Sequence, residues 1–153
     1  MAKCRSCFKW GFFLRLNKKG YCRKCEKTYS ENMVDYIAAY KKKISERKNL
    51  FCIQLDGVSL NNPNTGVSRQ KLIKRSRVGE KLLITMDQEK QGGIEEIKAS
   101  GFDGRQLGYL KPGNDTDIIK DHMKNKLFID ASISSISCKK GKCDVNVNLT
   151  AYS

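Results

Sequence analysis

The chain has 153 residues and a formal net charge of +14, with thirty Lys and Arg against sixteen Asp and Glu. No apolar run approaches the roughly 20 residues of a membrane-spanning helix, and the N-terminus Met-Ala-Lys-Cys lacks the pattern of a secretory signal. These features argue against membrane and secreted proteins. They predict a cytoplasmic protein of one domain, or of a mini-domain plus a small domain, whose seven cysteines stay reduced or bind metal.

The positive charge lies mainly in the first third of the chain. Residues 1–49 hold fourteen Lys and Arg against four Asp and Glu, a balance of +10, whereas residues 50–153 hold sixteen against twelve, a balance of +4. A strongly basic segment predicts an anionic partner, of which nucleic acid is the most common. An anionic membrane surface and simple solubility are the alternatives.

Four cysteines at the N-terminus form two Cys-x-x-Cys pairs, Cys4 with Cys7 and Cys22 with Cys25. Two tight turns joined by a short hairpin can direct four thiolates at one point, which predicts a structural Zn²⁺ site with no open coordination position. Between the pairs, residues 11–16 resemble a strand and residues 17–20 a turn. We therefore expect a zinc ribbon over residues 1–29, with a disulfide framework or a redox-active pair as alternatives.

The same segment interleaves basic and aromatic side chains. Such a surface can follow a phosphate backbone and stack on bases, although most aromatic rings of so small a unit should be buried. Trp10 is the first ring that we expect to be exposed. The candidate nucleic-acid-binding residues here are Trp10, Arg15, Lys18 and Lys19.

Residues 30–48 are predicted to form one amphipathic helix, within a connecting segment over residues 30–49. Ser30 is a suitable N-cap, and Met33, Ile37, Tyr40 and Ile44 recur at helical spacing. Lys and Arg crowd the expected C-terminal end, as the helix dipole favours. The apolar stripe either joins two domains or forms a coiled-coil dimer seam; we expect a monomer.

From residue 51 the pattern changes to short strands separated by turns. Strands are predicted at 51–55, 81–86, 94–99, 106–110, 127–138 and 143–149, with helices at 69–76 and 116–125. The last two strands are expected to form a hairpin that turns at residues 139–142. Cys138 and Cys143 would face each other across it as thiols, with a disulfide between them as the alternative. The order predicts an α+β domain over residues 50–153, a small, partly open six-stranded barrel with two helices.

Several stretches in this region match one family in order and spacing: residues 55–58 (LDGV), 68–74 (SRQKLIK), 78–82 (VGEKL) and 104–110 (GRQLGYL). They resemble the opening strand, the first helix with the second strand, and the G-x-x-[IV]-G-[YH]-[IL] strand of the HIRAN domain, particularly its short bacterial versions. The resemblance covers about two thirds of the chain. It implies a β-barrel module that binds single-stranded DNA, alongside a helicase or nuclease.

The resemblance also implies functional positions. Arg69 matches a basic residue that helps hold DNA, and Tyr109 matches the family's His or Tyr after glycine. Where the family carries a Tyr and an Asp that hold the 3′-terminal nucleotide, this chain has Gly92 and Gly93, so we expect backbone binding without recognition of a free 3′ end.

The residues around Arg69 support a phosphate-binding strip independently. Residues 69–81 contain six cations and one acid, and positions 70, 74 and 77 share one face of a helix. A solvated helix face is the alternative. The candidates in this half of the chain are Arg69, Gln70, Lys74, Arg77, Tyr109 and Lys111.

The sequence contains no Ser/His/Asp or Cys/His arrangement and no phosphate-binding glycine-rich motif. We therefore expect a non-catalytic, zinc-dependent nucleic-acid-binding protein. The alternative is an adaptor that docks a DNA-processing enzyme through the ribbon or the helix stripe.

Overall fold

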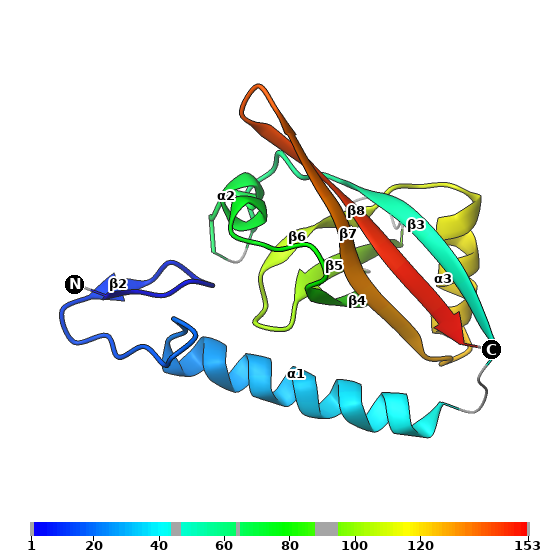
Figure 1. Ribbon diagram of the computed structural model, residues 1–153, viewed down its shortest axis with the longest axis horizontal. Coiled ribbons are helices and arrows are strands. Elements are labelled where there is room, and N and C mark those ends of the chain that lie inside the picture. The colour runs from blue at the N-terminus through cyan, green and yellow to red at the C-terminus, as the bar shows by residue number, and fades with distance from the viewer. Residues whose placement is uncertain (1, 44–46, 64, 88–94, 153) are drawn as a thin grey trace.

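The computed structural model describes every residue except 1, 44–46, 64, 88–94 and 153 (Figure 1). In chain order its elements are β1 (Ala2–Lys3), β2 (Trp10–Gly11), α1 (Arg23–Lys42), β3 (Lys48–Asp56), α2 (Arg69–Lys74), β4 (Lys81–Asp87), β5 (Glu96–Gly101), β6 (Gln106–Leu110), α3 (Asn114–Lys124), β7 (Ile129–Lys139) and β8 (Lys142–Tyr152).

Strands β3 to β8 form one antiparallel ring in the order β3-β6-β5-β4-β7-β8. Long pairings join β8 to β7 and β3, whereas β3–β6 and β4–β7 are paired over two residues each. The expected α+β fold, with six barrel strands and two accompanying helices, is confirmed. The ring of pairings is complete, and the two short seams are where the barrel is most nearly open.

The barrel forms because its strands alternate apolar and polar residues. In β8, Val145, Val147 and Leu149 are fully buried, while Asn146 and Asn148 between them are not. Leu72 and Ile73 of α2 and Ile119 of α3 complete the core. Ile118, which we expected to face inward beside Ile119, is largely exposed.

Helix α1 begins earlier than predicted. It starts at Arg23, directly after Cys22, and ends at Lys42, so Ser30 lies inside the helix instead of capping it. Nothing in residues 23–29 opposes a helix, and Glu26 supplies the acidic residue that a first turn favours. The prediction of a helix over residues 30–48 is therefore wrong at both ends, because Lys48 already belongs to β3.

The face of α1 that meets the barrel matches the predicted stripe only in part. α1 runs along the barrel (Figure 1), and ring contacts join Tyr36 to Phe102 and Phe128 at centroid distances of 5.4 and 5.8 Å. Asn32 adds a hydrogen bond to the Phe102 carbonyl. Of the predicted stripe, Tyr40 contacts Phe128 at 5.8 Å, whereas Ile37 is 44% exposed. Ile44 lies outside the described residues.

The hairpin between β7 and β8 turns at Lys140 and Gly141, both with positive φ, as the tight two-residue turn of a hairpin requires. This register places Cys138 opposite Cys143, and the two are joined by a disulfide. Our expectation of paired thiols at this position is therefore wrong, since direct cross-strand pairing brings the two side chains together.

None of the helices that the structure describes is long and apolar enough to cross a membrane.

Candidate metal centre and basic face

The four N-terminal cysteines converge although they come from different local structures. Cys4 and Cys7 lie on the turn between β1 and β2, where the Cys4 N–H donates to the Lys9 carbonyl at 2.8 Å. Cys22 is the N-cap of α1, and Cys25 lies in its first turn. The candidate ligand atoms all lie within 4.8 Å of one another, and three of the four residues are buried. This cluster can hold a metal ion.

The second pair does not form the turn that we predicted. Because Cys22 and Cys25 occupy the start of α1, their thiols lie at the positive end of the helix dipole, which favours thiolates. The expected strand over residues 11–16 is reduced to β2 and a single bridge between Leu16 and Cys22, whereas the turn at residues 17–20 is confirmed.

The thiols of the cluster differ in how readily they ionise. Burial raises the pKa of Cys4, but the Cys22 N–H, which donates to Cys4 Sγ at 3.2 Å, lowers it, and the net pKa is about 7. Burial raises the pKa of Cys7 and of Cys25, and the charge of Cys4 raises both further. Four thiolates at this spacing therefore repel one another, so a cation is needed to hold them all in the charged form.

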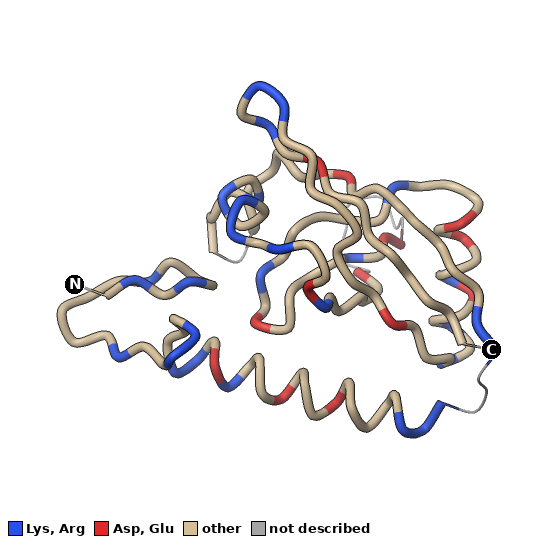
Figure 2. The backbone as a smooth tube through the Cα atoms, viewed as in Figure 1, with Lys and Arg blue, Asp and Glu red and all other residues tan. Residues whose placement is uncertain are grey.

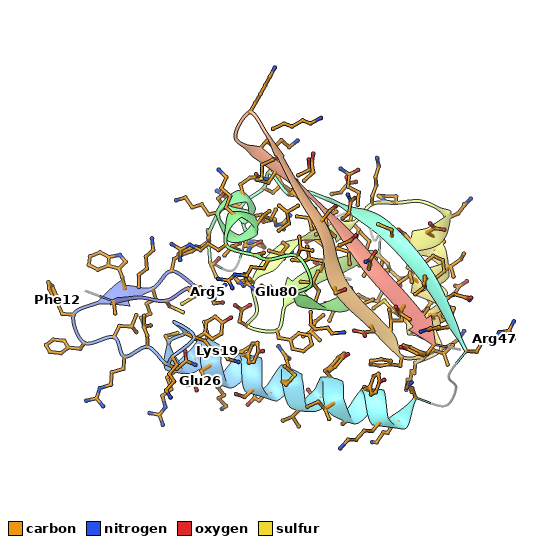
Figure 3. The ribbon with its side chains drawn as sticks, in the orientation of Figure 1. Arg5, Phe12, Lys19, Glu26, Arg47 and Glu80 are labelled. Atoms are coloured by element: carbon orange, nitrogen blue, oxygen red, sulfur yellow. A yellow bond between two sulfur atoms is a disulfide. The ribbon has the colours of Figure 1, made fainter. Side chains whose placement is uncertain are left out.

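A buried ion network connects the ribbon to the barrel. Asp103 accepts hydrogen bonds from Arg105 through its carboxylate and from the Ser6 hydroxyl through its carbonyl oxygen. Burial lowers the pKa of Arg105, but Asp103 and Glu80 raise it more, so its charge is retained. Burial and the charge of Asp103 raise the pKa of Tyr21 in the ribbon core to about 12. Figure 3 shows Arg5 and Glu80 close to this junction.

Three of the predicted nucleic-acid-binding residues form internal contacts instead. Arg69 is 2% exposed, donates to Asn62 Oδ1 and the Gly57 carbonyl, and lies over the Tyr109 ring at 5.1 Å. Tyr109 is buried, and its hydroxyl donates to Asp87 Oδ2 at 3.1 Å. The expectation that Arg69 faces a phosphate is corrected here, because its charge lies inside the fold and it positions β6.

Gln70 is likewise used within the fold. Its amide nitrogen donates to the Val58 and Cys143 carbonyls, and its amide oxygen accepts from the Cys143 N–H. These bonds tie α2 to the base of the β7–β8 hairpin, so Gln70 is not available to face a phosphate.

Next to Tyr109, Gly108 allows β6 to approach β3, since a Cβ there would lie 2.5 Å from the Asp56 carbonyl oxygen.

The other predicted residues are exposed, but they do not share one surface. Lys74 and Arg77 lie on or just after α2, whereas Lys18 and Lys19 lie beside the start of α1, with the Lys19 ammonium 4.3 Å from the centre of the Tyr29 ring. Lys111 is exposed between β6 and α3. Arg15 is exposed on the ribbon. Gly92 and Gly93 lie outside the described residues.

The ribbon exposes more aromatic surface than we predicted. Trp10 is 62% exposed, Phe12 82% and Phe13 98%. Phe12 points away from the rest of the molecule (Figure 3). We expected one or two free rings with Trp10 first, yet the two phenylalanines are the more exposed. The reason is that Tyr21, Leu14, Leu16 and Tyr29, not these rings, pack against the cysteine cluster.

A surface that we call the basic face is assembled from the ribbon, α2 and the hairpin tip (Figure 2). The Lys3 ammonium and the Arg75 guanidinium both lie over the Phe8 ring, which joins the ribbon to the end of α2. Gln70 joins α2 to the hairpin. The exposed cations of the basic face are Lys3, Lys9, Lys71, Lys74, Arg75, Arg77, Lys139, Lys140 and Lys142.

Our sequence analysis did not include Lys139, Lys140 and Lys142 among the candidate sites. They were identified only as a turn, although three lysines in four residues are themselves a signal for an anionic partner. Their proximity to α2 depends on the Gln70–Cys143 contact between residues far apart in sequence. No local pattern predicts that contact.

Two solved structures are similar to this chain. The HIRAN domain of human HLTF is 14% identical with a TM-score of 0.49, covering 69% of this chain and 76% of that chain. A protein from Lactobacillus plantarum is 13% identical with a TM-score of 0.45, covering 68% of this chain and 100% of that chain. A scan against family models and a search of curated proteins find no match.

The chain thus combines an N-terminal four-cysteine cluster with a six-stranded α+β barrel, and a HIRAN domain, which the sequence resembles, is among the solved structures to which the chain is similar. At this identity and TM-score the similarity establishes no function. What the chain binds has to be argued from its own residues.

Proposed function

We propose that this protein is a non-catalytic nucleic-acid-binding protein whose N-terminal ribbon is folded around one structural Zn²⁺. Four sulfurs bound at about 2.3 Å to one zinc lie about 3.8 Å apart, and the Cys7 and Cys22 sulfurs are separated by 3.8 Å. A site of four thiolates leaves no position for substrate or water, so the metal would hold Cys4, Cys7, Cys22 and Cys25 together and supply no chemistry.

The basic face carries the second part of the proposal. Nine exposed cations run from the ribbon across α2 to the hairpin tip among the described residues, and this arrangement suits an extended phosphate backbone. Trp10, Phe12 and Phe13 lie on the same ribbon and offer rings for stacking on unpaired bases. Phosphate contacts combined with accessible rings favour single-stranded DNA over a duplex, whose bases are already stacked.

Several finer features belong to the proposal. We propose that residues 1–29, 30–49 and 50–153 act as ribbon, connecting segment and barrel, with α1 beginning inside the first of these. We further propose a cytoplasmic monomer that works alongside a helicase or nuclease. The exposed candidates Arg15, Lys18, Lys19 and Lys111 would make secondary contacts, since they lie outside the basic face.

A second function is favoured by one observation. Phe12 and Phe13 are almost fully exposed, and large exposed apolar side chains often mark a protein contact. In that case the ribbon would dock a DNA-processing enzyme, and the protein would be an adaptor.

Fluorescence anisotropy with labelled single- and double-stranded oligonucleotides of equal length, each at two salt concentrations, separates the two functions. Nucleic-acid binding predicts a preference for the single strand and an affinity that falls steeply with salt, because each neutralised phosphate releases counterions. Absence of binding at low salt, or an affinity that does not change with salt, would favour the adaptor.

A further inference from the structure

A cavity lies between α1 and the flank of the barrel, on the opposite side of the molecule from the hairpin tip. Its volume is about 550 Å³, within the roughly 300–1,000 Å³ of small-molecule sites. Residues from α1, β4, the segment after α3 and the end of β8 line it. The aromatic contacts between α1 and the barrel border this space, so the cavity is part of the junction.

The walls of the cavity are mainly apolar. Aliphatic and aromatic side chains from three different elements face it, and Leu82 among them belongs to the barrel core. The Phe128 ring contacts Tyr36 and Tyr152, with centroid distances of 5.8 and 5.7 Å. The apolar lining residues are Ala39, Leu82, Leu83, Ile84, Met123, Leu127, Phe128 and Ile129. Such a surface suits an alkyl chain or an aromatic ring.

Three lysines, Lys42, Lys43 and Lys126, line the same cavity, and Asp35 is the only acidic residue among the described lining residues. The Lys43 ammonium lies 4.5 Å from the Tyr152 ring centre, which directs that cation toward the barrel side of the junction. The nearby Asp130 does not offset these charges, because Lys81 pairs with it at 2.8 Å. Among the described lining residues, lysines therefore outnumber acidic residues beside an apolar interior.

Lys126 occupies a position that normally takes glycine. It follows α3 with φ of 56°, where the Lys126 N–H donates to the Met123 carbonyl and the Leu127 N–H to the His122 carbonyl, the bonds of a glycine-type helix end. A non-glycine residue in this conformation is strained, because its Cβ approaches the backbone too closely. The lysine in this chain thus brings a cation to the cavity at a position where glycine would be the more stable choice.

We propose that the cavity binds a small amphipathic anion, an alkyl or aryl carboxylate. The apolar part lies against Leu82, Ile84 and Phe128, and the carboxylate faces Lys42, Lys43 and Lys126. Because the ligand would contact both α1 and β4, it would fasten the helix to the barrel. This site is separate from the basic face and does not depend on the proposed nucleic-acid binding.

Calorimetric titration of the zinc-loaded full chain with decanoate, and with decanol as its uncharged counterpart, tests the proposal. We expect one decanoate per chain and weaker binding of decanol. Lys126→Gly removes one cation at a position that suits glycine, so it should fold normally and weaken decanoate binding about fivefold, as expected for one partly exposed charge contact. Decanol binding should not change.

Two matched controls make the result specific. Lys140→Gly removes a lysine at the hairpin tip whose backbone is also in the left-handed conformation, with φ of 50°. This variant should leave decanoate binding unchanged. Ala39→Trp should fill the cavity and abolish binding, whereas Ala38→Trp, at the neighbouring exposed helix position outside the lining, should not.

No saturable binding of decanoate, or equal affinities for decanoate and decanol, would overturn the proposal. Equal losses in Lys126→Gly and Lys140→Gly would also overturn it, since they would mean that the anion binds the basic protein without a site. Binding that survives Ala39→Trp would place the ligand elsewhere.

Discussion

The ribbon and the barrel keep their shapes by different means. Eighteen buried residues form the core of the barrel within the described chain, nearly all of them aliphatic. Within the described residues, the apolar cluster of the ribbon has four buried members, of which three are candidate metal ligands and the fourth is Tyr21. A unit of this size cannot bury enough apolar surface to fold alone, so we propose that its cohesion comes from a bound metal. In this proposal, one region of the protein depends on an ion and the other on packing.

The difference extends to what each region exposes. The barrel domain buries the rings of Phe102 and Tyr109, whereas the ribbon leaves those of Trp10, Phe12 and Phe13 in solvent. A metal-centred fold therefore frees aromatic rings for contact with a partner. The basic face joins the two regions, so a partner that follows it would contact both.

Loss of one metal ligand should have the largest effect. Cys25→Ser should release zinc and unfold the ribbon while the barrel stays folded, because structural zinc contributes about 10–16 kcal/mol in small zinc peptides. Zinc content by a chromophoric chelator and amide NMR spectra would measure both. Cys52→Ser, at the exposed free cysteine outside the cluster, is the control; equal zinc content in both variants would contradict the metal site.

Breaking the ion network should test whether the two regions are coupled. Arg105→Met leaves Asp103 buried without its cation, and removal of one partner of a buried pair typically costs about 3–5 kcal/mol. Chemical denaturation should show this loss while zinc stays bound. Arg77→Met, at an exposed position, should change the free energy of unfolding by less than about 0.5 kcal/mol. A similar small change for Arg105→Met would mean that the network contributes little.

A change in the barrel core should leave the metal site intact. Leu107 is fully buried in β6, and Leu107→Ala should cost about 2–5 kcal/mol through lost packing and a residual cavity. Leu50→Ala, at a position 73% exposed, is the matched control. Urea unfolding followed by circular dichroism measures both variants, and loss of zinc from folded Leu107→Ala would show that the two regions do not stabilise independently.

The smallest expected effect concerns recognition of the 3′ end of a DNA strand. With glycine at positions 92 and 93, the chain has neither a ring nor a carboxylate there to contact a terminal nucleotide. Oligonucleotides with a 3′-hydroxyl and a 3′-phosphate should compete equally for the protein. A preference of tenfold or more for the hydroxyl, about 1.4 kcal/mol, would show that other residues form an end pocket.

The sequence predicts the barrel well where local pattern decides the structure. Gln106–Leu110 is found with the observed bounds, and the alternation of Val145, Val147 and Leu149 is confirmed, because burial on one face of a strand is visible at a period of two. The spacing of the four cysteines likewise predicts their convergence. The sequence does not predict the start of α1 correctly. Ser is favoured as an N-cap, but it is also tolerated inside a helix, where Ser30 lies.

Arg69 shows where sequence reasoning ends. An arginine among lysines is expected to lie on an exposed strip. The Arg69 guanidinium instead donates to the Gly57 carbonyl and to Asn62 Oδ1. The choice between an exposed and a buried cation depends on these tertiary acceptors. The same holds for Lys139, Lys140 and Lys142, whose relevance depends on the position of the hairpin next to α2.

The central claim is that nucleic acid binds along the basic face, and one matched pair of variants tests it most directly. Lys140→Gly and Lys126→Gly both replace a lysine whose backbone is in the left-handed conformation. Lys140 lies on the basic face and Lys126 lines the cavity. The salt dependence of single-strand binding should be measured by anisotropy for both variants and the unmodified protein. We predict that Lys140→Gly lowers the slope of log affinity against log salt by about 0.7, the value for one phosphate contact on a single strand, and that Lys126→Gly does not change it. Equal slopes for all three proteins would contradict the claim.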